Sequence, residues 1–241
     1  MKSYCYTSIV GIYFGKLLTC EKVLILLSFS IREPVNGLTH LFGAIMSVIG
    51  LAALIVKALE TSGSILAVAA VTIFGTSMIL LYSASATYHM VVARDHIIAF
   101  LRRVDHSMIF VLIAGTYAPL CLISLRGNTG WVLFAVIAGI ACAGVTFKLV
   151  WFHAPRWLST VLYIAMGWIV IFFSPLLAPI IGTAGMLMLL FGGVFYTIGG
   201  FIYWLKPRFL SFKHMGFHEI FHVFILIGSL FHFICVYGYV L

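Results

Sequence analysis

The 241-residue sequence is poor in charged residues, and in acidic residues above all. Only 8% of its residues are charged, against roughly 25% in soluble domains. So few charged side chains cannot cover a water-facing surface, and 63% of the residues are hydrophobic. The composition therefore excludes a soluble globular domain and indicates an integral membrane protein. In that setting a net charge of +8 indicates loops that face anionic lipid headgroups rather than a nucleic-acid surface.

The sequence also lacks paired cysteines and a cleavable signal peptide. Its five cysteines (5, 20, 121, 142 and 235) show no C-x-x-C spacing, so a disulfide framework is not supported. Near the N-terminus, Lys16, Glu21 and Lys22 interrupt the apolar residues, and no A-x-A-like site follows. The next apolar run, residues 23 to 31, would span only about 14 Å as a helix. We therefore expect residues 1–31 to form an interfacial or loosely ordered extension of a membrane domain at 32–241.

Long uncharged stretches dominate the rest of the chain. A membrane-spanning helix needs about 20 apolar residues, so the 49-residue run from 157 to 205 predicts two spans, broken near Pro175, Pro179 and Gly182. The expected fold is an all-α, polytopic bundle of seven transmembrane helices. These helices are expected at about 37–59, 65–92, 105–125, 130–152, 157–177, 184–205 and 217–240.

The distribution of lysine and arginine predicts the orientation of these helices. Twelve Lys and Arg residues fall in the N-terminal segment and in the connections that follow the second, fourth and sixth spans, whereas only Lys57 and Arg126 fall on the other side. Cytoplasmic loops are enriched in these residues. The N-terminus is therefore expected in the cytoplasm and the C-terminus outside, as in a multi-pass protein of the bacterial inner membrane.

Polar side chains, most of them ionisable, gather at the cytoplasmic ends of four of the predicted spans. They are Glu33, Asn36 and His40 on the first span, Ser85 and His89 on the second, Asp105 on the third, and His218 and His222 on the seventh. Ionisable groups within a span are costly and indicate a functional site. Three imidazoles with an open fourth position form a catalytic zinc site, and His89, His218 and His222 would supply them. The sequence therefore predicts Zn²⁺ in the inner leaflet.

The remaining histidines have simpler explanations. His96, His106, His153 and His214 lie in or beside predicted loops, where interfacial hydrogen bonding is the expected role. His232 lies ten residues beyond His222, about 15 Å along a helix, so it cannot share a metal with His222. We expect it to pack or to form hydrogen bonds.

The sequence HEIFH at 218–222 also matches the H-E-x-x-H pattern of zinc proteases, in which the glutamate is the general base. That interpretation needs a third ligand, which His232 is too distant to provide. Glu219 also lies about 100° around the helix from His218, whereas His222 lies only about 40° away. The protease interpretation is therefore not favoured.

Four segments together resemble one known family. EPVNGLTH (33–40), SASATYH (83–89), LRRVDHSMIFVLIAGTYAP (101–119) and HEIFHVFILIGSLFHF (218–233) are similar to motifs of the bacterial hemolysin III family. That family is related to the progestin and adipoQ receptors and, more distantly, to the alkaline ceramidases. The resemblance runs from about Arg32 to Leu241.

The resemblance implies a seven-helix membrane protein that contains zinc. The family's S-x-x-x-H, D and H-x-x-x-H elements correspond to Ser85 with His89, to Asp105, and to His218 with His222. In receptor members the three histidines bind zinc and the aspartate contacts the zinc-bound water. A different residue stands at the position of Glu219 in the receptors, which implies that this glutamate is dispensable. Glu33, Asn36 and His40 match the first-helix motif.

These observations favour a zinc-dependent hydrolase of a membrane lipid amide or ester. Asp105 would act as the general base, and Ser85 would orient the attacking water or donate a hydrogen bond to the oxyanion. The alternatives are a non-enzymatic lipid sensor with structural zinc, or a cytolysin as the family name suggests. Membrane lipids are the expected partners and nucleic acid is not, while the sequence leaves open whether the chain forms a homo-oligomer.

Overall fold

The computed structural model describes residues 31–151, 154–210, 212 and 215–241. Nearly all of these residues are helical and none forms a strand, which confirms the all-α prediction. The expected extension at 1–31 lies almost wholly outside the described residues. The helices are α2 (Pro34–Thr61), α3 (Ile65–Met90), α4 (Asp95–Pro119) with the π-helix η1 (Leu120–Leu125), α5 (Gly127–Val150), α6 (Arg156–Trp168) with the 3-10 helix η2 (Ile169–Phe173), α7 (Ser174–Leu205), η3 (Arg208–Leu210), and α8 (Phe217–Cys235) with the π-helix η4 (Val236–Val240).

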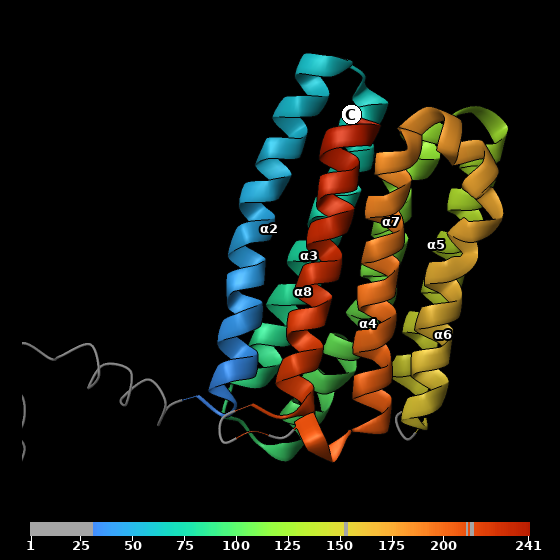
Figure 1. Ribbon diagram of the computed structural model, residues 1–241. Coiled ribbons are helices and arrows are strands. Elements are labelled where there is room, and N and C mark those ends of the chain that lie inside the picture. The colour runs from blue at the N-terminus through green and yellow to red at the C-terminus, as the bar shows by residue number, and fades with distance from the viewer. Residues whose placement is uncertain (1–30, 152–153, 211, 213–214) are drawn as a thin grey trace, which may run out of the picture.

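Within this described part of the chain, six helices are long and apolar enough to cross a membrane. One of them is the 50-residue stretch Arg156–Leu205, which unites α6 and α7. The predicted break in this stretch is confirmed at Gly182, whose φ of 67° and ψ of 175° are not helical. Figure 1 shows that the chain runs along the bundle through α6 and returns beside it through the later part of α7.

The helices stand side by side in a single bundle (Figure 1). α3 packs between α2 and α4, α5 packs against α4, and α8 closes the bundle by contacting both α7 and α2. Close approach of α3 and α4 depends on Gly115, where an added Cβ would collide with the side chain of Ser77. Inside a membrane no hydrophobic effect of water drives helices together, so they depend on close packing, and small residues of this kind allow it.

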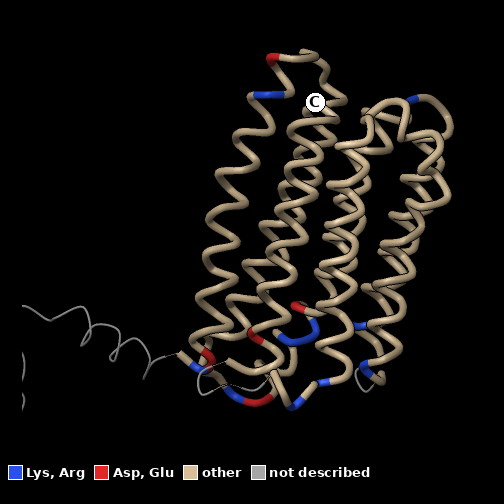
Figure 2. The backbone as a smooth tube through the Cα atoms, viewed as in Figure 1, with Lys and Arg blue, Asp and Glu red and all other residues tan. Residues whose placement is uncertain are grey.

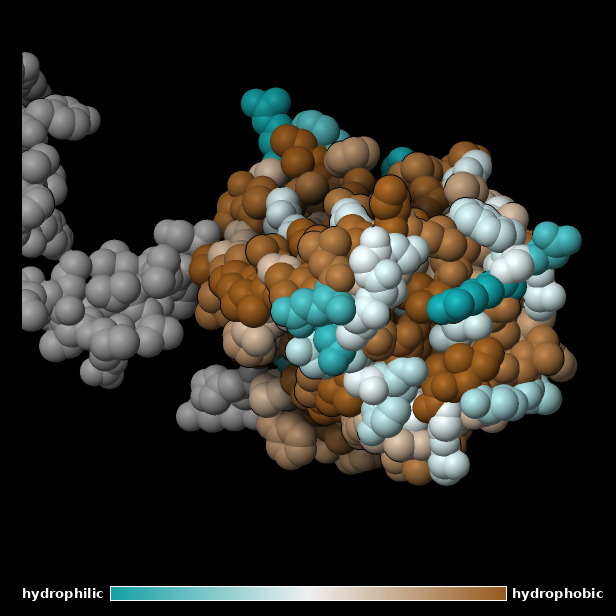
Figure 3. Space-filling model, turned by 90° about the horizontal axis from the view of Figure 1, so that it is seen from above, coloured by the Kyte–Doolittle hydropathy of each residue, from teal (hydrophilic) through white to brown (hydrophobic). Residues whose placement is uncertain are grey.

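Charged residues mark one end of the bundle. Figure 2 shows most Lys and Arg residues at the end where α2 and α8 begin, opposite the C-terminus. At the other end, the charged residues among those that the structure describes are Lys57 and Glu60 near the end of α2 and Arg126 between η1 and α5. Viewed onto that end, the surface is mainly apolar with separate hydrophilic groups (Figure 3). The long middle of the bundle is therefore bounded by one strongly basic end and one sparsely charged end.

The third helix begins earlier than predicted. The charges of Asp95, Arg102 and Arg103 led to an expected start at Asp105, but α4 already begins at Asp95. Arginine can place its apolar stem along a helix while its head reaches the interface, so these charges do not end the helix. Asp105 consequently lies in the third turn of α4, with its side chain turned into the bundle and only 7% of the residue exposed.

Candidate metal centre and adjoining cavity

Three histidines from two helices meet at the basic end of the bundle. His89 comes from the last turn of α3, and His218 and His222 come from the first turns of α8. One ligand atom from each lies within 4.8 Å of the other two. The spacing of four residues places His218 and His222 on one face of α8, and that face is turned towards His89. This arrangement could hold a metal ion.

The separation of one pair of histidine nitrogens and a buried nitrogen without a partner are compatible with a bound metal ion. The Nε2 atoms of His89 and His218 are 3.3 Å apart. Two nitrogens bound to one tetrahedral zinc at about 2.0–2.1 Å would be separated by about 3.3 Å. Nδ1 of His222 is buried and has no hydrogen-bond partner among the described residues. A buried lone pair of this kind is costly unless something binds it.

A carboxylate outside the cluster fixes the orientation of His89. Oε2 of Glu33, the residue that precedes α2, lies 2.6 Å from Nδ1 of His89. Burial opposes ionisation of Glu33, but the hydrogen bond with His89 and the nearby Arg32 outweigh it and lower the Glu33 pKa below its ordinary value. Nδ1 therefore donates its proton to a carboxylate, which leaves the Nε2 lone pair facing the other histidines. Metal-binding histidines are usually held in this way.

Asn36 joins this carboxylate to α8. Its side-chain amide donates to Glu33 at 3.2 Å and to Oε1 of Glu219 at 2.8 Å. The second oxygen of Glu219 accepts from the backbone N–H of Gly216 at 2.7 Å, which caps the start of α8. Glu219 thus lies outside the group of ligand atoms and links α8 to α2. This placement agrees with the prediction that it points away from the ligand face.

His40 supports the cluster without belonging to it. Its ring stacks on that of His222, with centroids 3.6 Å apart and planes inclined by 10°. Its edge also packs against Tyr82, at a centroid distance of 5.1 Å. His40 is therefore placed to set the orientation of the His222 ring, a role that sequence alone did not reveal.

Ser85 and Asp105 form a second polar pair beside the histidines. The side chains of Ser85 and Asp105 are close enough to interact, and both residues are buried. Because Ser85 precedes His89 by one turn of α3, the Asp105 carboxylate lies about one helical turn from the metal cluster. Asp105 is not among the residues whose ligand atoms converge.

The structure also places His106, which sequence analysis assigned to a loop edge, inside α4. Its Nε2 lies 4.0 Å from Oδ2 of Asp105 and 3.4 Å from the hydroxyl of Tyr203 on α7. The residues between Asp95 and Asp105 include several charges, so the sequence pattern did not predict that His106 lies inside a helix. The one available sign of its role was that it directly follows Asp105, a predicted catalytic carboxylate.

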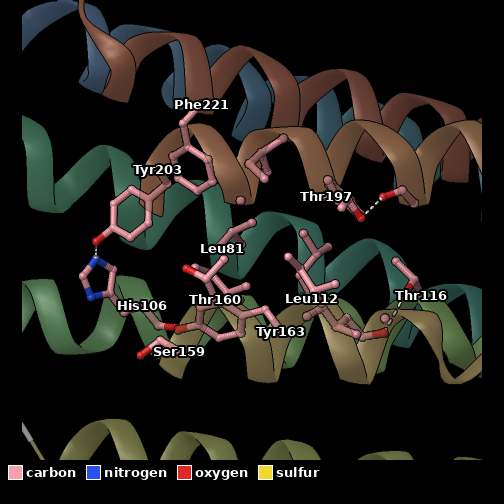
Figure 4. A pocket seen from close by; sticks show the side chains of 18 of the residues that line it. Leu81, His106, Leu112, Thr116, Ser159, Thr160, Tyr163, Thr197, Tyr203 and Phe221 are labelled. Carbon is pink, nitrogen blue, oxygen red and sulfur yellow. Dashed lines mark hydrogen bonds between the residues drawn. The ribbon is translucent and has the colours of Figure 1, made fainter. Parts of the chain in front are cut away.

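A cavity of about 410 Å³ adjoins these polar groups. His218, His222, Ser85 and Asp105 all contribute to its wall, together with His106. Figure 4 shows His106, Tyr203 and Ser159 towards one end and Thr116 towards the other, with Leu112 between them. The cavity then continues between α4, α6 and α7, where it is lined largely by apolar side chains. His232 lines this deeper part and stacks on Tyr196, away from the metal cluster.

Known proteins share these segments. The family model described as Haemolysin-III related matches residues 29–233. The chain is 40% identical over 225 residues to Hemolysin-3 of Bacillus cereus, covering 92% of this chain and 97% of that protein. It is 38% identical over 217 residues to the Hemolysin-3 homolog of Bacillus subtilis (strain 168), covering 88% and 96%. Because these matches span all the helices that carry the histidine cluster, the chain belongs to the haemolysin-III-related family of multi-pass bacterial membrane proteins.

Proposed function

We propose that the protein is a zinc-dependent hydrolase of a membrane lipid amide or ester. The observation that carries this proposal is the convergence of His89, His218 and His222, because the last two also line a cavity large enough for a lipid chain. Zinc held by three imidazoles would polarise the carbonyl group of the lipid and would provide a hydroxide nucleophile near neutral pH. The protein's own residues bind the lipid, keep the ligands oriented and move the proton.

Asp105 is the proposed general base and then the general acid. Its carboxylate lines the same cavity as His218 and His222, so it can accept a proton from the attacking water and return it to the leaving group. Ser85 lines the same cavity beside Asp105 and helps to keep its carboxylate in place. Glu33 plays the corresponding part for His89 by accepting the Nδ1 proton. Apolar side chains in the deeper cavity bind the acyl chain and exclude water.

A cell-based comparison tests this proposal. Lipids would be profiled in a deletion strain that makes either the wild-type protein or the Asp105→Asn form at matched levels. We expect one acylated lipid class to accumulate with Asp105→Asn and its fatty acid to fall, because binding is retained without proton transfer. Identical lipid profiles for the two strains, with zinc bound in both proteins, would contradict the hydrolase proposal.

A non-enzymatic role with structural metal is the second candidate. It is favoured by the position of the cluster, which joins α3 to α8 through His89 and the two α8 histidines. In that case the metal would stabilise the bundle and the protein would act as a lipid sensor. Removal of metal would then lower the melting temperature, and Asp105→Asn would leave cellular function unchanged. The cytolysin role suggested by the names of the relatives has no separate support from the cavity or the cluster.

We also propose seven membrane crossings, with the basic end of the bundle in the cytoplasm. The reversal at Gly182 separates Arg156–Leu205 into two crossings, and the gathering of Lys and Arg at one end supports the orientation. A periplasmic reporter fused after Leu241 is therefore expected to be active, and a cytoplasmic reporter at the same place silent. Activity of only the cytoplasmic reporter would overturn this topology.

A further inference from the structure

The cavity beside the metal cluster carries an excess of positive charge. Among the described residues, four cationic side chains line it and Asp105 is the one carboxylate. The cationic side chains are Arg102 and Arg103 of α4, Lys148 of α5 and Arg156 at the start of α6. The net positive charge at this end of the cavity attracts an anion.

Three of these charges come from different helices, and all three side chains line the same cavity as His106. Nζ of Lys148 is held against the wall by a 2.7 Å hydrogen bond to Ser159. The guanidinium of Arg156 lies over the ring of Tyr203, 5.6 Å from its centroid. Lys148 and Arg156 are thus each positioned by a neighbour, at the end of the cavity where Ser159 and Tyr203 lie (Figure 4).

The general preference for basic residues at the cytoplasmic side requires only that the charges lie at one end of the bundle. Arg94, Lys206 and Arg208 meet it at that end without lining the cavity. Arg102 and Arg156 are exposed as well, but their side chains also form part of the cavity wall. Their place in the wall therefore needs a separate explanation.

Beyond the cationic end, the cavity suits one hydrocarbon chain. Arg102 and Leu120 both line it and are 18 residues apart, which corresponds to about 27 Å along a helix. One leaflet of a bilayer has about 15 Å of hydrocarbon, so a chain from one leaflet fits within this length. Asp105 lies one turn from Arg102, about 4.5 Å along α4. The acyl carbonyls of a phospholipid are a few bonds from its phosphate, which matches this short separation.

We propose that the cavity binds a lipid with a phosphate headgroup, held by Arg102, Lys148 and Arg156, with its acyl chain in the apolar part. The guanidinium forks of two arginines match phosphate oxygens in geometry, and lysine adds a point charge. The inference rests on the proposed hydrolase function and narrows its substrate from membrane lipids in general to acylated phosphate lipids.

Binding to the purified full-length protein in a neutral detergent tests the inference without requiring turnover. The probes are oleoyl lysophosphatidic acid, monoolein with the same chain and a neutral head, oleate, and inorganic phosphate. Native mass spectrometry gives the bound fraction of each. We expect lysophosphatidic acid to bind at least tenfold more tightly than monoolein, because a charge-assisted hydrogen bond contributes about 1.5–3 kcal/mol. Oleate should bind more weakly than lysophosphatidic acid, and inorganic phosphate should not displace it.

Charge variants locate the site. Arg156→Gln and Lys148→Gln are each expected to weaken lysophosphatidic acid binding about tenfold and to leave monoolein binding unchanged, which also shows that the variants are folded. Arg208→Gln removes a charge from the same end outside the cavity and should have no effect. The inference is wrong if monoolein or oleate binds as tightly as lysophosphatidic acid, if inorganic phosphate competes as strongly as a second phosphate lipid would, or if Arg208→Gln weakens binding as much as Arg156→Gln.

The same measurements separate this inference from the hydrolase proposal. Tight binding of lysophosphatidic acid with no lipid cleaved in cells or in vitro would support the headgroup site and contradict the hydrolase. Cleavage of a neutral lipid amide, with equal rates for wild type and Arg156→Gln, would support the hydrolase and contradict the headgroup site.

Discussion

Replacing His222 by alanine is expected to remove most of the zinc from the purified protein, which in its wild-type form should bind about one ion per chain. The ligand atoms of His222, His89 and His218 lie within 4.8 Å of one another, so two imidazoles alone would remain. Loss of an outer hydrogen-bond partner typically lowers metal affinity 10–100-fold, and loss of a ligand should exceed about 100-fold on that scale. Elemental analysis after dialysis, followed by competition with a chelator, measures the change.

Two further variants give this result its meaning. Glu33→Gln keeps the shape of the side chain but removes the charge that accepts the Nδ1 proton of His89, so it should lower zinc affinity 10–100-fold. His232→Ala alters a buried histidine that packs on Tyr196 away from the cluster and should leave zinc content unchanged. Equal zinc in wild type and His222→Ala would refute the assignment, as would loss of zinc in His232→Ala alone.

The convergence of the histidines was predictable because polar residues are so rare in this chain. An ionisable group in an apolar span must face the interior of the bundle rather than lipid. The basic end of the bundle was identifiable from lysine and arginine alone. Helix periodicity then placed His218 and His222 on one face and Glu219 off it. The positions of these few polar residues were therefore enough to predict which side chains lie close together, without knowledge of the tertiary structure.

Side-chain partners between helices were not predictable in the same way. The bond from Glu33 to His89 and the stacking of His40 on His222 depend on how α2 is rotated and how closely it approaches α3 and α8. Hydropathy does not determine how α2 is rotated about its own axis, because much of this helix faces outward and it has few polar residues. The sequence therefore grouped Glu33, Asn36 and His40 as a polar cluster without assigning their contacts.

The early start of α4 shows a second limit of sequence analysis. Charge density suggested that the membrane helix began at Asp105, whereas the helix extends ten residues further towards its N-terminus. This extension carries Arg102 and places His106 within a regular helix beside Asp105. Arg102 reaches the cavity from this extension, which also places His106 away from the end of the helix. Lys148 and Arg156 come from α5 and α6 and do not depend on it.

Replacing Asp105 by asparagine is expected to abolish hydrolysis while zinc stays bound. The carboxylate is buried in the cavity wall beside Ser85, but it is not among the converging ligand atoms. Asparagine has nearly the same shape and cannot accept the proton, and loss of a general base typically lowers the rate about 100- to 10,000-fold. Hydrolysis by purified protein and complementation of a deletion strain, each at matched zinc content, measure the effect.

Glu219→Gln is the matched comparison, because Glu219 is the general base that the H-E-x-x-H pattern would require. Its carboxylate instead accepts hydrogen bonds from Asn36 and from the backbone of Gly216. Glutamine retains an oxygen that can serve one of these donors, so the variant should lose some stability and little activity. Both carboxylates lie near the cluster at the same end of the bundle, so a general loss of charge would affect the two variants alike. An inactive Glu219→Gln beside a fully active Asp105→Asn would transfer the base role to Glu219 and restore the protease-like interpretation of HEIFH.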